Sequence, residues 1–117
     1  MAKRHDVYKE SQGCPVETAL EVIGAKWKGA IVFHLLDGEL RFMELRRRMP
    51  KVTQRILSKA LRELECDGVI SRAVYPTNPP QVGYQFTEHG ARLRASILAL
   101  HDWGRGHMGE ARLLAAE

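Results

Sequence analysis

The sequence of 117 residues predicts a mainly α-helical domain with one small β-hairpin, an α+β fold. Three observations carry this prediction. Apolar residues recur at helical spacing through most of the chain. A link of only three residues, 50–52, joins two of the expected helices. Two strand-like runs, 69–75 and 83–86, flank the proline-rich loop 76–81, which is typical of a hairpin.

Two helices are expected before residue 40. The first begins at Pro15, because proline suits the first helical position, and it ends at Gly24. The second covers 26–36 and is apolar on nearly all sides, which places it in the middle of the core. A turn at Asp37-Gly38 follows, and residues 40–42 are expected to pair as a minimal strand.

The next two helices are expected to form a helix-turn-helix. The first covers 42–49, with Phe42, Leu45 and Met49 directed inward, and it is closed by Pro50. Thr53 is a good N-cap for the second, which runs to about Asp67 and ends at Gly68. Because a hairpin follows, the sequence predicts a winged helix-turn-helix.

A last helix is expected to complete the domain. Thr87 caps it, and it continues past Trp103 before fraying near Gly104, Gly106 and Gly109. The expected organisation is a flexible N-terminal arm over 1–13, one domain over 14–109 that includes this helix, and a frayed tail over 110–117.

Basic residues are concentrated in one part of the chain. The net charge is +4, yet the segment 41–62 holds eight basic residues and a single acidic one, Glu44. Such focusing favours a polyanionic partner, because clustered cations release the counterions of phosphates. The alternative is an ordinary solvated face.

The helix expected over 53–67 sorts its side chains onto two sides. The apolar side holds Ile56, Leu57, Ala60, Leu61 and Leu64. The outer side holds Gln54, Arg55, Ser58, Lys59 and Arg62, followed by an acidic last turn with Glu63, Glu65 and Asp67 that is expected to point away from phosphate. Such a helix suits the major groove of double-stranded DNA, entered by its N-terminal end.

The side chains of this helix are assigned different roles on DNA. Glutamine pairs with adenine and arginine with guanine, so Gln54, Arg55 and Ser58 are expected at base edges, with Lys59 and Arg62 at phosphates. In the hairpin, the prolines hold the tip extended, and we interpret this tip as a wing that contacts the DNA backbone or the minor groove. The alternative is a plain surface loop. The full set of candidate DNA contacts is Arg46, Lys51, Thr53, Gln54, Arg55, Ser58, Lys59, Arg62, Arg72, Thr77, Asn78 and Gln81.

Several motifs together resemble one known family. They are Cys14-Pro15-Val16, Gly24-Ala25-Lys26-Trp27, His34-Leu35-Leu36-Asp37-Gly38, Arg41-Phe42-x-Glu44-Leu45, Thr53-Gln54-Arg55-Ile56-Leu57, Leu61-Arg62-Glu63-Leu64-Glu65-x-Asp67-Gly68 and Tyr75-Pro76 with Pro79-Pro80, Val82, Tyr84, Thr87 and Gly90. The pattern is similar to the HxlR family of bacterial winged-helix regulators, MarR-like in shape, and it covers about 14–103. Ala25 stands where the family often has Gly, and Gly83 where it often has Glu.

The resemblance implies a homodimer on a pseudo-palindromic DNA operator, with the first and last helices at the dimer interface. In the last helix, Leu93, Ile97, Leu100 and Gly104 repeat at spacings of four, three and four, which suits a partner helix. The alternative is packing onto the domain's own core. The candidate interface residues are Val16, Leu20, Leu93, Ile97, Leu98, Leu100 and Trp103.

Cys14 is a candidate redox switch. It directly precedes a helix N-terminus, where the dipole favours the reactive thiolate, and family members use the cysteine of this Cys-Pro motif to sense oxidants or electrophiles. The alternative is a small buried hydrophobe. Cys66 is expected to be structural or inert.

The sequence argues against several other functions. Phosphate-cradling loops, nucleophile elbows and His-Glu-x-x-His zinc motifs are absent, so neither an enzyme nor a metal or cofactor is expected, and His34 is interpreted as a hydrogen-bonded core residue. No apolar run of membrane length and no signal peptide is seen, which predicts a cytoplasmic protein without a membrane partner. An effector is left open. The rival function is a winged-helix protein-interaction module without specific DNA binding.

Overall fold

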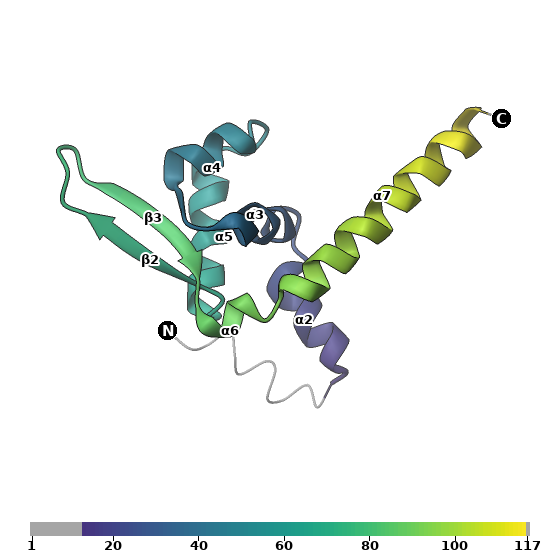
Figure 1. Cartoon of the computed structure of the whole chain (residues 1–117), viewed down its shortest axis with the longest axis horizontal. Helices are drawn as coiled ribbons and strands as arrows, with labels where there is room; N and C mark the ends of the chain where they lie inside the picture. The colour runs from purple at the N-terminus through teal and green to yellow at the C-terminus, as the bar shows by residue number, and fades with distance from the viewer. Residues whose placement is uncertain (1–12, 117) are drawn as a thin grey trace.

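The computed structural model describes residues 13–116, and Figure 1 shows a body of short helices from which a hairpin and a long C-terminal helix project. The elements are α2 (Pro15–Ile23), α3 (Lys28–His34), the 3-10 helix η1 (Leu35–Asp37), β1 (Leu40–Arg41), α4 (Phe42–Arg48), α5 (Gln54–Cys66), β2 (Ile70–Tyr75), β3 (Gln81–Phe86), α6 (Glu88–Ala91) and α7 (Arg94–Ala116). This architecture confirms the predicted mainly α fold with a β-hairpin wing. All of the predicted N-terminal arm except Gly13 lies outside the described residues.

The sheet is antiparallel and has the strand order β1-β3-β2. The predicted minimal strand exists as β1, in which Leu40 pairs with Tyr84 and Arg41 with Gly83. The hairpin strand β3 begins at Gln81, two residues before the predicted start, because Gln81 still pairs with Tyr75 on β2. The loop of the wing is therefore shorter than the sequence suggested.

The core lies where α3, α4 and α5 meet the sheet. Its largest fully buried side chains are Ile31, Leu35, Leu45, Leu57, Leu61, Leu64, Ile70, Val32 and Val52. The second predicted helix is central, as expected, but it begins at Lys28 instead of 26 and ends in the 3-10 turn η1. It also leaves Phe33 exposed on the side that faces away from the core.

The predicted single last helix is wrong, because the structure has two. Thr87 caps α6, accepting from the Gly90 amide and donating to the Gly68 carbonyl, and this ties α6 to the base of β2. Arg94 at the start of α7 donates instead to the carbonyl of Leu36, next to α3. The two helices are anchored to different parts of the body, and a turn at residues 92–93 separates them.

The long helix α7 also does not fray near its glycines. It continues through Gly104, Gly106 and Gly109 to Ala116. The residues that follow these glycines, with sequence Glu-Ala-Arg-Leu-Leu-Ala-Ala, are strong helix formers, which offsets the cost of about 1 kcal/mol for each glycine.

Candidate nucleic-acid interface

The helix α5 is held firmly at both ends. At its start, the Thr53 hydroxyl accepts from the Ile56 amide at 3.1 Å, the N-cap predicted from the sequence. Leu57, Leu61 and Leu64 are fully buried and fix its inner face. Near its end, Glu63 pairs with the buried Lys28 of α3 at 2.8 Å. These contacts fix the orientation of the outer face of α5.

That outer face is polar and basic, with the sidedness that the sequence predicted. Gln54, Arg55, Lys59 and Arg62 are exposed, and Ser58 is half-exposed. Ile56 departs from the prediction, because 43% of its surface is exposed. It lies in the first turn of α5, directly before the fully buried Leu57.

The acidic last turn of α5, predicted to point away from phosphate, makes contacts within the domain itself. Glu63 forms the ion pair with Lys28, Glu65 lies 4.0 Å from Arg72 of β2, and Asp67 is buried. Glu63 and Glu65 thus link α5 to α3 and to the wing, through partners that are distant in sequence.

Further basic side chains surround the start of α5. In α4 and the turn that follows, Arg47, Arg48 and Lys51 are exposed, whereas Arg46 is half-buried. Sequence reasoning singled out Arg46 and missed Arg47. Helical spacing could have shown this difference. Arg46, one position from the buried Leu45, lies closer to the buried face of α4 than Arg47, which is two positions away.

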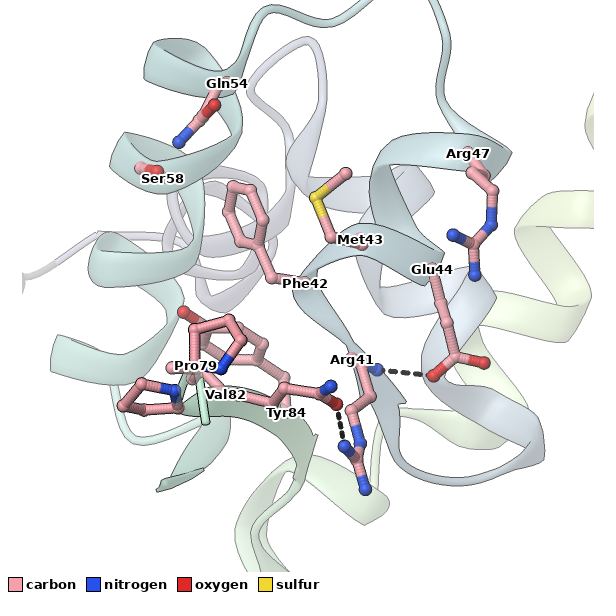
Figure 2. A pocket seen from close by; sticks show the side chains of 12 residues that line it. Arg41, Phe42, Met43, Glu44, Arg47, Gln54, Ser58, Pro79, Val82 and Tyr84 are labelled. Carbon is pink, nitrogen blue, oxygen red and sulfur yellow. Dashed lines mark hydrogen bonds between the residues drawn. The ribbon is translucent and has the colours of Figure 1, made fainter. Parts of the chain in front are cut away.

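A groove of about 730 Å³ runs between α4, the start of α5 and the wing (Figure 2). Gln54 and Ser58 of α5 lie on one side, and Pro79 and Val82 of the wing lie on another, with Phe42 between them. The remaining lining residues are Arg41, Met43, Glu44, Arg47, Pro80, Gln81 and Tyr84. The groove therefore brings two of the predicted base-contacting residues, Gln54 and Ser58, to one surface with the wing, together with Arg41 and Arg47, which were not predicted as DNA contacts.

Arg41 connects α4 and the wing at this groove. Its backbone amide donates to Glu44 Oε1 at 2.8 Å, and its Nη1 donates to Gln81 Oε1 (Figure 2). Its guanidinium also lies 4.5 Å from the centre of the Tyr75 ring. Tyr75 in turn donates its hydroxyl to Glu39, and this hydrogen bond raises the pKa of Tyr75. Sequence reasoning missed this cluster because its members come from three separate segments.

The other candidate contacts of the wing have different surroundings. Asn78 and Gln81 are exposed at the tip. The Thr77 hydroxyl donates to the Pro79 carbonyl at 2.7 Å, so this side chain stabilises the loop itself. Arg72 lies further down β2, opposite Tyr84 and beside Glu65, away from the tip.

A second surface, formed by α2 and α7, is apolar and exposed. Its exposed side chains from the predicted interface are Val16, Leu20, Leu98, Leu100 and Trp103. Ile97 is buried, and Leu93 packs against the same core, so both serve their own domain, as the alternative interpretation had it. The neighbouring ring of Phe33 stacks on His101, with centroids 4.8 Å apart. This surface lies away from the groove and the wing (Figure 1).

Three titratable residues noted in the sequence can now be placed. Cys14 is exposed at the N-cap of α2, which contradicts its interpretation as a small buried hydrophobe. Cys66 is half-buried in α5, and Cys14 and Cys66 are not joined by a disulfide. His34 is half-buried instead of lying in the core, and burial followed by the charge of Arg48 lowers its pKa.

Within residues 13–116, no group of three or more His, Cys, Asp or Glu side chains is arranged to hold a metal ion. None of the helices described is long and apolar enough to cross a membrane.

Comparison with known proteins places the chain in a family. The model of the HxlR-like helix-turn-helix family matches residues 22–112. Two relatives from Bacillus subtilis (strain 168) bear the name HTH-type transcriptional regulator. YybR is 46% identical over 107 residues, which cover 92% of this chain and 86% of the relative. YdeP is 56% identical over 93 residues, which cover 80% and 73%.

A solved structure agrees with these relatives. The redox regulator HypR in its reduced form superposes with a TM-score of 0.80 at 45% identity, covering 85% of this chain and 98% of HypR. The names of these three proteins describe regulators and not enzymes. The chain therefore belongs to the HxlR-like helix-turn-helix family and is a transcriptional regulator.

Proposed function

We propose that this regulator binds a specific, pseudo-palindromic operator in double-stranded DNA as a homodimer. The observation that carries the proposal is the outer face of α5. Gln54, Arg55 and Lys59 are exposed together on a helix whose inner face is fully buried and whose orientation is fixed by the Thr53 cap and the Lys28–Glu63 ion pair. A rigid, exposed and basic helix face of this size fits the major groove.

The residues of this face take different roles. Gln54, Arg55 and Ser58, in the first two turns, read base edges, because glutamine and arginine form paired hydrogen bonds with adenine and guanine. Lys59 and Arg62 bind phosphates, together with Lys51 and the exposed arginines of α4. The wing tip, with Asn78 and Gln81, extends the contact along the backbone or into the minor groove.

The dimer is supported by the apolar surface of α2 and α7. Leu100, Trp103 and Leu20 are each more than half exposed, and exposed apolar patches of this kind mark interaction sites. A two-fold dimer through this surface presents two copies of α5 at a spacing of roughly 34 Å, one turn of DNA.

Two substitutions on α5 test the DNA-binding proposal. The target is DNA selected by the protein from a random pool, and the reference is unselected DNA, each titrated with salt. Arg55→Ala is expected to cost about 1–3 kcal/mol on selected DNA only, relaxing specificity at one position. Lys59→Ala is the matched control, since it lies one turn further along. Lys59→Ala is expected to weaken binding to both DNAs alike and to lower the slope of the salt dependence by about one.

Either of two results would contradict the proposal. Absence of DNA binding even at low salt would leave the protein-interaction module as the function. Equal loss on selected and unselected DNA for Arg55→Ala would reassign Arg55 to a phosphate.

We also propose that Cys14 makes the regulator responsive to oxidants or electrophiles. Its thiol is exposed beside α2, one of the two helices of the proposed dimer surface, and the similar protein HypR is described as a redox regulator. Alkylation of Cys14 in a Cys66→Ser background is expected to change operator affinity severalfold, whereas a Cys14→Ser variant treated in the same way stays unchanged. Unaltered binding by fully alkylated protein would exclude this role.

A further inference from the structure

We propose that Arg41 is a positioning residue that fixes the wing at a set distance from α5. This inference deepens the proposed function and rests on it, because the spacing matters only if the wing and α5 engage one DNA duplex. Arg41 was not among the DNA contacts predicted from the sequence.

The backbone of Arg41 belongs to the helix-turn-helix. Its amide donates to Glu44 Oε1 in the first turn of α4, at 2.8 Å. In β1 the same residue pairs with Gly83 of β3. Arg41 is therefore the point at which α4 joins the hairpin.

The side chain of Arg41 reaches the end of the hairpin nearest the tip. Tyr75 and Gln81 form the last pair of the β2–β3 ladder before the loop. The guanidinium donates to the Gln81 amide oxygen and covers the Tyr75 ring at 4.5 Å. One side chain thus holds both strands where they enter the tip, and a hairpin that projects from the body needs such support to keep one orientation (Figure 1).

Glu39 and Gly83 also contribute to the arrangement that holds Arg41 against the hairpin. The Glu39 carboxylate accepts from the Tyr75 hydroxyl, which fixes the ring that Arg41 covers. A Cβ atom on Gly83 would lie 2.2 Å from Glu39 Oε2 and 3.1 Å from Tyr75 Cε2. The absence of a side chain at Gly83 is what admits the carboxylate and the ring together.

A positioning role and a simple phosphate contact predict different effects of Arg41→Lys. Lysine keeps the charge but lacks the planar group that stacks on a ring and donates in a fixed direction. If Arg41 only supplied charge, lysine would replace it well. If Arg41 holds the wing, Arg41→Lys behaves like the uncharged change Tyr75→Ala, which removes the surface that the guanidinium covers.

The first measurement uses the full-length protein without DNA. Amide hydrogen exchange over residues 75–81 is expected to be about fivefold faster in Arg41→Lys and in Tyr75→Ala, because each removes the stacking of the guanidinium on the Tyr75 ring, while exchange in α5 stays unchanged. Arg47→Lys, in the same groove, and Val74→Ala, on the same strand, are the matched controls and stay within twofold. Unaltered exchange in Arg41→Lys would overturn the proposal whether or not the protein binds DNA.

The second measurement is affinity for the selected DNA at several salt concentrations. Arg41→Lys and Tyr75→Ala are expected to lose about fivefold in affinity with the salt slope of the parent protein, because no phosphate contact is removed at the helix. A lower slope in Tyr75→Ala than in Val74→Ala, or full affinity in Arg41→Lys, would contradict a positioning role. Failure of the parent protein to bind DNA would instead refute the proposed function.

Discussion

His34 shows how one half-buried side chain makes the stability of this domain depend on pH. Burial, and then the charge of Arg48, lower the pKa of its imidazole from the ordinary value of 6.5. The unfolded chain therefore binds a proton at His34 more readily than the folded chain. The contribution of His34 to the free energy of unfolding is fully present above pH 6.5, and it is lost as the pH falls through the lowered pKa of the folded state.

We accordingly expect the domain to be less stable at pH 5 than at pH 7.5, and His34→Gln to remove part of this difference. Urea denaturation of the parent and the variant at both pH values measures it. His89→Gln, at an exposed position of α6, is the control and should leave the difference intact. An equal difference in the parent and in His34→Gln would show that other groups cause it.

Most single residues whose environment is decided by local sequence were predicted well, Ile56 being an exception. Thr53 caps α5 and Leu57 and Leu61 are buried because N-cap chemistry and helical spacing act within a few residues. The arrangement of Glu63 against Lys28 was missed, since the two residues are 35 positions apart and their pairing depends on how α3 packs against α5. The Arg41 cluster was missed for the same reason.

At the scale of elements, α5 depends on its first turn. The Thr53 cap satisfies an amide that would otherwise lack a partner, so Thr53→Ala is expected to lower the free energy of unfolding by about 1 kcal/mol. Thr53→Ser retains the hydroxyl and should lose little. Equal stabilities of the alanine and serine variants in urea would show that the cap contributes nothing.

Most of the order of helices and strands followed from the sequence, but several boundaries did not, and two of them show the reason. The start of β3 depends on the pairing of Gln81 with Tyr75, which no local sequence pattern predicts. The break between α6 and α7 depends on separate anchors, Thr87 at the base of β2 and Arg94 at Leu36. Both boundaries are set by contacts between elements, and helical periodicity alone cannot show them.

At the scale of the whole molecule, the basic and the apolar surfaces are separate. The groove, α5 and the wing form one, and α2 with α7 forms the other (Figure 1). Sequence periodicity found most of the apolar surface but also assigned Leu93 and Ile97 to it, because spacing does not tell whether a seam meets a partner or the domain's own core.

The proposed dimer predicts the effect of a charge on this apolar surface. Trp103 is 68% exposed, so Trp103→Glu should leave the fold of one chain intact while weakening dimerisation at least about tenfold. Val74→Glu places the same charge on an exposed site of the wing and is the control. Sedimentation over a range of concentrations measures the change, and equal dimerisation of the two variants would place the interface elsewhere.

The most direct measurement is a hydroxyl-radical footprint of the protein on its selected DNA, with Arg55→Ala beside it. Two protected segments related by two-fold symmetry, with centres roughly 34 Å apart, are predicted, each weakened by the substitution. A single protected segment, or two segments whose protection is indifferent to Arg55, would contradict recognition by paired α5 helices.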